Sequence, residues 1–202
     1  MKNTLALIAV AGIATVASAQ SGSLSMTSSA ATVDTSGAAA TFTLSVWGDA
    51  DFGTHIAGGG FALSATGGAG IVTSMAASVP AWGALGFQDN GATGDGNYAG
   101  VIFGQLIFPP VIAPAAESAL GNGAVLLATF SVTAAADSAG TVDWSTADAG
   151  GDFILEIYDD ANGSFTQLTA ADFGGVSVNF VPAPSAMALL GLGGLVAGRR
   201  RR

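Results

Sequence analysis

The sequence predicts an all-β protein whose body is a β-sandwich of about eight to ten short strands. Several segments alternate apolar and polar residues, as half-buried strands do. Glycine-rich stretches separate these segments, and glycine makes up 30 of the 202 residues. Half of the residues are apolar and only 9% are charged, so the chain can fill the core of one such domain.

Four segments show the clearest alternation, and we expect each of them to be a strand. They are residues 41–47, 126–133, 153–158 and 176–180. In the first segment Phe42, Leu44 and Val46 are expected to face the core. Trp47 and Tyr158 fall on the polar side of their segments, which predicts that both side chains are exposed.

The remaining strands are less regular. Residues 100–108 are apolar almost throughout, which predicts a strand buried on both faces. Weaker alternation predicts further strands at residues 23–28, 60–66, 71–75 and 140–145. Between two of the strand segments, the residues Asp-Asp-Ala-Asn-Gly at 159–163 predict a hairpin turn, because Asn-Gly is a strong local turn former.

The first 19 residues have the features of a signal peptide. Lys2 gives a positive start, an apolar stretch follows from Leu5 to Val16, and Ala17 and Ala19 form a small-x-small cleavage pattern before Gln20. The alternative is a buried first helix. We therefore expect export, and with no cysteine in the chain the domain cannot rely on disulfides.

The last 22 residues combine three features. Pro182 and Pro184 favour an extended segment, residues 186–198 form an apolar run, and four arginines close the chain. As a helix the run would rise about 20 Å, which is short for a hydrocarbon core of about 30 Å. The arginines would hold its end on the cytoplasmic side. These features suit a temporary anchor that is removed after export, and a C-terminal helix of the domain is the alternative.

The order of Val181, Pro182, Ala183 and Pro184, an apolar run and an arginine cluster resembles the PEP-CTERM sorting signal of Gram-negative bacteria. Ala183 stands where that family usually has Glu. The resemblance implies processing by exosortase, a membrane peptidase, and a place at the cell surface or in an exopolysaccharide or biofilm matrix. The arginines concerned are Arg199, Arg200, Arg201 and Arg202.

A second resemblance lies in the body of the chain. Residues 121–144 are similar to the middle of cohesins and related carbohydrate-binding sandwiches, where a Leu-Ala-x-Phe strand precedes a glycine turn. This resemblance implies a jelly-roll or cohesin-like sandwich. The expected division is then a signal peptide at 1–19, a β-sandwich at 20–180 and a sorting signal at 181–202.

Charge is distributed very unevenly along the chain. The five basic residues are Lys2 and the four terminal arginines, while all 14 acidic residues lie between Asp34 and Asp172. The body therefore carries no Lys or Arg with which to neutralise phosphates. This composition excludes nucleic acid as a partner.

Few residues in the body could support catalysis. His55 is the only histidine, and neither cysteine nor a Gly-x-Ser-x-Gly motif accompanies it. Two glutamates, Glu117 and Glu156, leave open a glycosidase, which needs a pair of carboxylates. We expect a protein that is not an enzyme.

Two kinds of binding site remain open. Asp89 and Asp95 lie in a loop rich in Asn and Gly, and Asp159 and Asp160 are adjacent, so calcium is a candidate ligand. The same residue types also build ordinary turns. Trp47 and Tyr158 could stack on sugar rings if they are exposed together.

These observations together predict an exported, acidic and non-catalytic β-sandwich at the cell surface or in the extracellular matrix. A secreted carbohydrate-binding module is the alternative, and a glycosidase is the third interpretation. The expected partners are exosortase and an extracellular polysaccharide. Contact with a membrane is expected only through the C-terminal tail, and no cofactor is expected other than a calcium ion.

Overall fold

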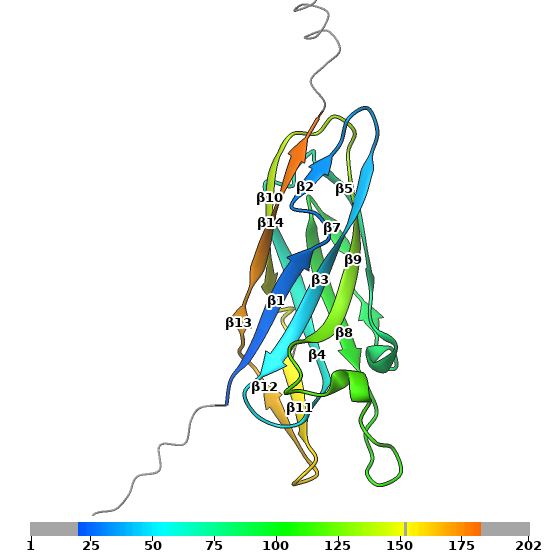
Figure 1. The fold of residues 1–202 in the computed structure, drawn as a ribbon, viewed down its shortest axis with the longest axis vertical. Coiled ribbons are helices and arrows are strands. Elements are labelled where there is room, and N and C mark those ends of the chain that lie inside the picture. Colours follow the sequence, from blue (N-terminus) through cyan, green and yellow to red (C-terminus); the bar gives the residue numbers. More distant parts are fainter. Residues whose placement is uncertain (1–19, 152, 183–202) are drawn as a thin grey trace, which may run out of the picture.

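The computed structural model describes residues 20–151 and 153–182, which form an all-β sandwich with strands of both sheets running along one axis (Figure 1). The predicted signal peptide, with Ala17 and Ala19, lies outside the described residues. So does the predicted tail from Ala183 and Pro184 to the arginines. In the part of the chain that the structure describes, no helix has the length and apolar character to span a membrane.

The first sheet has five strands in the order β13-β1-β3-β9-β5. Its long central strands are antiparallel to their neighbours, and β1 also pairs with β13 in parallel. The bounds are β1 (Gly22–Ser28), β3 (Ala40–Ala50), β5 (Val72–Ser78), β9 (Val125–Ala134) and β13 (Asp172–Phe173).

The second sheet has nine strands, with a main order β12-β11-β4-β10-β14-β2 and with β8 pairing β4, β6 and β7. Its bounds are β2 (Thr32–Asp34), β4 (His55–Thr66), β6 (Gln88–Asp89), β7 (Ala92–Gly94), β8 (Asn97–Gly104), β10 (Gly140–Ala147), β11 (Leu155–Asp159), β12 (Ser164–Leu168) and β14 (Gly175–Val181). Two short 3-10 turns, η1 (Ala81–Gly83) and η2 (Ala116–Ser118), complete the described elements.

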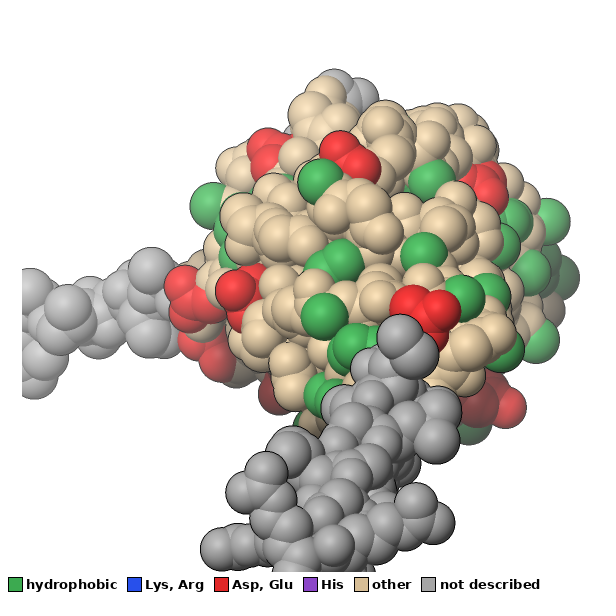
Figure 2. All heavy atoms as spheres, turned by 90° about the horizontal axis from the view of Figure 1, so that it is seen from above, with side chains coloured by type: hydrophobic (Ala, Val, Ile, Leu, Met, Phe, Trp, Pro, Cys, Tyr) green, Lys and Arg blue, Asp and Glu red, His purple; other side chains and the backbone are tan. Residues whose placement is uncertain are grey.

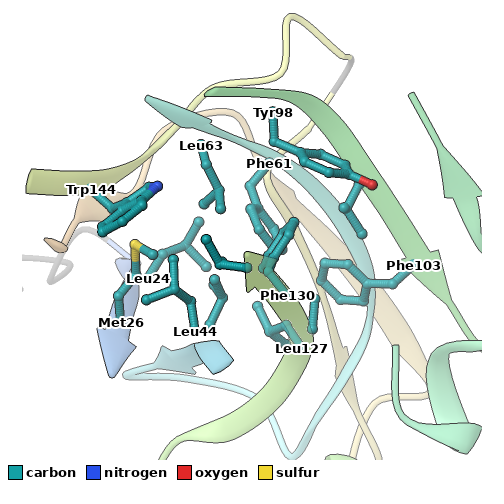
Figure 3. Close-up of a cluster of buried hydrophobic side chains, with 14 of the residues drawn as sticks. Leu24, Met26, Leu44, Phe61, Leu63, Tyr98, Phe103, Leu127, Phe130 and Trp144 are labelled. Carbon is teal, nitrogen blue, oxygen red and sulfur yellow. The ribbon is translucent and has the colours of Figure 1, made fainter. Parts of the chain in front are cut away.

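The core lies between the two sheets and is rich in aromatic side chains (Figure 3). Phe130 of β9 meets Phe61 of β4 and Tyr98 of β8 edge-on, with ring centroids 6.2 and 5.0 Å apart. These contacts join the two sheets directly. The inward residues predicted for β3, Phe42, Leu44 and Val46, are all buried there, which confirms the alternation.

A bulge in the first sheet changes part of the predicted pattern. The pairing of β3 with β9 shifts between Val46 and Trp47, so that Val46 faces Ala128 and Trp47 faces Leu126. Leu127 of β9 is passed over by this register and is fully buried. The strict alternation expected for residues 126–133 is therefore wrong at its first two positions.

The apolar segment 100–108 is not a strand buried on both faces. Strand β8 ends at Gly104, and the side chains of Ile102, Leu106 and Phe108 are exposed. The expectation of two-sided burial applies to parallel sheets covered by helices, whereas β8 pairs with β4 in antiparallel fashion. Its outer face meets solvent.

The predicted hairpin at residues 159–163 is confirmed. Strands β11 and β12 are antiparallel, with Asp159 opposite Ser164, and Gly163 takes the positive φ of 60° that a tight turn requires. At the end of the body, Val181 belongs to β14 and pairs with Asp34 of β2.

Candidate functional site

The outward side of the five-stranded sheet is covered mainly by hydroxyl side chains. Directly paired residues of antiparallel strands point to the same face, so the register gives the composition of this side. We call it the hydroxyl face, and it consists of Ser25, Thr27, Thr41, Thr43, Ser45, Ser74, Ser78, Thr129, Ser131 and Thr133.

These hydroxyls form rows across the strands. Thr41 lies opposite Thr133, and their Oγ1 atoms are 3.4 Å apart. In another row the Ser78 and Thr129 hydroxyls are hydrogen-bonded at 2.7 Å. Neighbouring strands are about 4.8 Å apart, so the hydroxyls within a row are regularly spaced. The face thus offers many groups that can both donate and accept hydrogen bonds.

Trp47 is the aromatic residue of this face. It stands opposite Ser25 on one side and, after the bulge, opposite Leu126 on the other. Its indole Nε1 donates a hydrogen bond of 3.0 Å to the Thr27 Oγ1, which fixes the ring against β1. The side chain is half-buried, so part of the ring remains accessible as the sequence predicts.

Tyr158, the other predicted sugar-stacking residue, is only 2% exposed, and the prediction that it shares an exposed face with Trp47 is wrong. It lies in the other sheet, on β11. There it clusters with Ala57 and Ile107, and its ring packs on Phe165 with centroids 4.9 Å apart. The alternation of apolar and polar residues in β11 does not reveal that a loop distant in sequence, which contains Ile107, covers this side of the strand.

The predicted calcium ligand Asp89 is engaged by its own chain. Its Oδ1 accepts hydrogen bonds from the Tyr98 hydroxyl at 2.6 Å and from the Gly91 backbone N–H at 2.8 Å. Burial, together with the hydrogen bond to Asp89, raises the pKa of Tyr98 to about 12. Asp95 sits in the adjacent turn with a positive φ of 53°.

The second predicted pair also takes part in local contacts. Asp159 accepts hydrogen bonds from the Ala161 N–H and the Asn162 side-chain amide, both within the hairpin turn. Asp160 Oδ2 lies 3.3 Å from the Nδ1 of His55, which opens β4 and is largely buried. Among residues 20–151 and 153–182, no three His, Asp or Glu side chains come together as a metal site. Calcium binding therefore stays a prediction.

One acidic group was not predicted from the sequence. A shallow hollow at the edge of the five-stranded sheet is lined by Asp49, Asp51 and Asp172 together with residues 21–23. Asp172 arrives there because β13 pairs with β1, a contact between distant parts of the chain that no local pattern indicates. Hydrogen bonds from the Ser21 backbone and hydroxyl lower the pKa of Asp51.

The surface carries one sign of formal charge. Seen from the end where the described chain stops, acidic side chains are scattered between uncharged ones (Figure 2). Every Lys and Arg of the sequence lies outside the described residues. By contrast, the ten residues of the hydroxyl face are uncharged, and Asp49 follows at the end of the same side, two residues beyond Trp47.

No protein-family model matches the chain, and no curated protein matches it. Several solved structures with a distantly similar strand arrangement are cohesin modules. One is a cohesin module of a family 33 glycoside hydrolase from Clostridium perfringens, with a TM-score of 0.47 and 8% identity over 81% of this chain and 98% of that one.

Another is the seventh ScaB type I cohesin of Pseudobacteroides cellulosolvens, with a TM-score of 0.49 and 12% identity over 81% of this chain and 96% of that chain. The sixth cohesin of scaffoldin B from Acetivibrio cellulolyticus, solved with a dockerin, has a TM-score of 0.43 and 12% identity over 78% and 99% of the two chains. These values describe a distant likeness of fold, and the sandwich assignment stands on the strand pairing itself.

Proposed function

We propose that this protein is an exported, non-catalytic module of the cell surface or the exopolysaccharide matrix, and that it binds a neutral polysaccharide through the hydroxyl face. The observation that carries the proposal is the arrangement of hydroxyl rows around the half-buried ring of Trp47. A polysaccharide presents the same kinds of group, namely hydroxyls along the chain and apolar ring faces between them.

The chemistry of the face favours such a ligand. Ser and Thr hydroxyls can exchange hydrogen bonds with sugar hydroxyls in either direction. The indole of Trp47 is held by Thr27, so less freedom is lost when a sugar ring stacks on it. The surrounding body carries carboxylates without Lys or Arg, which disfavours acidic polysaccharides and leaves neutral ones.

Export and sorting belong to the same proposal. The expected signal peptide and the PEP-CTERM-like tail support it, because both are segments that are removed when a protein is sorted to the envelope. Intact-mass measurement of the protein isolated from its own cells should show a chain that starts near Gln20 and lacks Arg199 to Arg202. A mature chain that keeps all four arginines contradicts sorting by exosortase, while the binding proposal stands independently.

Binding is tested with the variant Trp47→Ala. Affinity electrophoresis in gels that contain neutral β-glucan, neutral α-glucan or acidic alginate measures retardation of the protein by each polymer. We expect retardation by a neutral polymer, at least a tenfold weaker affinity in Trp47→Ala, and no retardation by alginate. Phe165→Ala is the matched control, because Phe165 is an exposed aromatic residue of the other sheet.

Two outcomes contradict the proposal. If Trp47→Ala and the unchanged protein bind every polymer equally, the hydroxyl face is not the binding surface. If the protein releases reducing ends from a polymer that it binds, it is a glycosidase. Assaying His55→Ala in the same way shows whether the one histidine, which contacts Asp160, is needed for such release.

A further inference from the structure

The connection between β8 and β9 begins with a loop that exposes four large apolar side chains. We call residues 105–115 the apolar loop. In this loop Leu106 is 45% exposed, Phe108 59%, Val111 85% and Ile112 38%. The loop projects from the end of the sandwich opposite to the end where the described chain stops (Figure 1). No charged residue occurs between Asp95 and Glu117.

The base of the apolar loop is firmly held. The Gln105 backbone N–H donates to the Ala57 carbonyl at 2.8 Å, and its side-chain Nε2 donates to the Ile56 carbonyl and the Ser118 hydroxyl, both at 2.7 Å. The Gln105 Oε1 accepts the Ala115 N–H at 2.8 Å, which closes the loop across its neck. The exposed apolar side chains are therefore presented by an ordered loop.

Ile107 adds an apolar anchor on the inner side of the same loop. It is 5% exposed and packs with Ala57 and Tyr158. The loop thus divides its apolar residues into one that anchors it to the sandwich and four that point into solvent. Ile107 alone attaches the loop to the core. The four exposed side chains do not pack in the core, and exposed apolar groups of this kind indicate an interaction surface.

The tip of the loop has no free backbone donor. Phe108 N–H donates to the Ile112 carbonyl at 2.9 Å, and the N–H groups of Val111 and Ile112 both donate to the Phe108 carbonyl at 2.8 Å. Positions 109 and 110 between them are prolines, which have no N–H. Donors that find no partner are costly in hydrocarbon. Residues 108–112 therefore expose apolar side chains without an unpaired N–H, which suits the water-poor headgroup region of a bilayer.

The charges at this end of the molecule indicate which kind of surface fits. The hairpin between β11 and β12, with Asp159 and Asp160, points to the same end as the apolar loop (Figure 1). Glu117 follows the loop in η2. Carboxylates are repelled by anionic lipids, and they are attracted by the ammonium groups that lie outermost in zwitterionic phospholipids.

We infer that the apolar loop docks the protein on a zwitterionic phospholipid bilayer by inserting the side chains of Phe108 and Val111 beneath the headgroups. Insertion of a few apolar side chains gives reversible binding in the interface plane, unlike a spanning helix. The loop lies at the opposite end from the point where the described chain stops (Figure 1), and the inference does not rest on the proposed polysaccharide binding. A second copy is a poorer occupant, because it would bring two sets of carboxylates together.

The chain has no cysteine, so a single Val111→Cys places one NBD fluorophore at the tip. The full chain labelled there is mixed with phosphatidylcholine vesicles or with phosphatidylglycerol vesicles. We expect the NBD emission to shift to shorter wavelength and to rise at least twofold with the first vesicles, and to change much less with the second. The matched control carries the label at Thr133→Cys on the hydroxyl face, where no change is expected.

The same label in a chain that carries both Leu106→Ser and Phe108→Ser tests the neighbouring side chains. Both residues are exposed, so this variant should keep its circular dichroism spectrum and lose at least tenfold in the affinity read by the tip label. Because the label reports the loop alone, membrane contact by the apolar tail does not produce the expected result.

Three outcomes overturn the inference. An unchanged NBD emission with both kinds of vesicle excludes insertion into a bilayer. It would indicate instead that the loop inserts into a pocket of another protein. A change that depends on protein concentration without lipid identifies a second copy as the occupant. Equal responses with the tip label and the Thr133 label show that the protein adsorbs without using the loop.

Discussion

Replacing Phe130 by Ala is expected to remove an aromatic contact that joins the two sheets. Phe130 is completely buried and meets Phe61 and Tyr98 edge-on across the sandwich. Truncating a buried Phe to Ala costs about 3–5 kcal/mol, which includes the cavity that it leaves. We therefore expect the free energy of unfolding to fall by about 4 kcal/mol, a large part of the about 5–15 kcal/mol that stabilises a typical domain.

Urea unfolding followed by tryptophan fluorescence measures this loss. With a slope of about 2–3 kcal/mol per molar urea, the midpoint should fall by about 1.5 M. Phe165→Ala is the control, because Phe165 is half-exposed on β12 and contacts Tyr158 alone among the aromatic rings. It should lose no more than about 1 kcal/mol. Equal losses in the two variants, with unchanged slopes, would refute the assignment of Phe130 to the centre of the core.

Two further predictions concern charge. Because the 14 carboxylates of the body face no Lys or Arg, the melting temperature should rise with monovalent salt. At fixed ionic strength, 1 mM calcium should raise it further only if Asp89, Asp95 or the Asp159-Asp160 turn binds the ion. Identical melts in calcium, magnesium and EDTA would exclude calcium. The pKa of Tyr98 is raised to about 12, so its neutral form stabilises the fold below pH 10 and that contribution is lost between pH 10 and 12. Absorbance at 295 nm should show one tyrosine that ionises near pH 12 and that is missing in Tyr98→Phe. Ionisation of Tyr98 near pH 10 would contradict its burial and its hydrogen bond to Asp89.

Local alternation was sufficient to predict much of the first sheet and of the hydroxyl face. Thr41, Thr43 and Ser45 alternate with inward apolar residues, and the structure keeps that alternation along β3. The predicted exposure of Trp47 followed from the same period. The rows of hydroxyls across several strands did not, because the register between β3, β9 and β5 depends on pairings that a single segment does not encode.

The apolar loop shows a different limit of the sequence. The apolar pattern of residues 100–108 does not distinguish a buried strand from a shorter strand that is followed by a projecting loop. The difference is made by Gln105, whose side chain bonds to β4, to η2 and to the loop's own neck. Tyr158 was predicted wrongly for the related reason that Ile107 of this loop covers it.

The parallel pairings of β1 with β13 and of β2 with β14 bind the first strands of the body to its last ones. When the chain is synthesised from its N-terminus, β1 and β2 therefore remain without these partners until Val181 has been made. The contacts that close the sandwich are the most distant in sequence, and such contacts form slowly. The fold is therefore complete only when the last strand becomes available, whichever way the chain emerges.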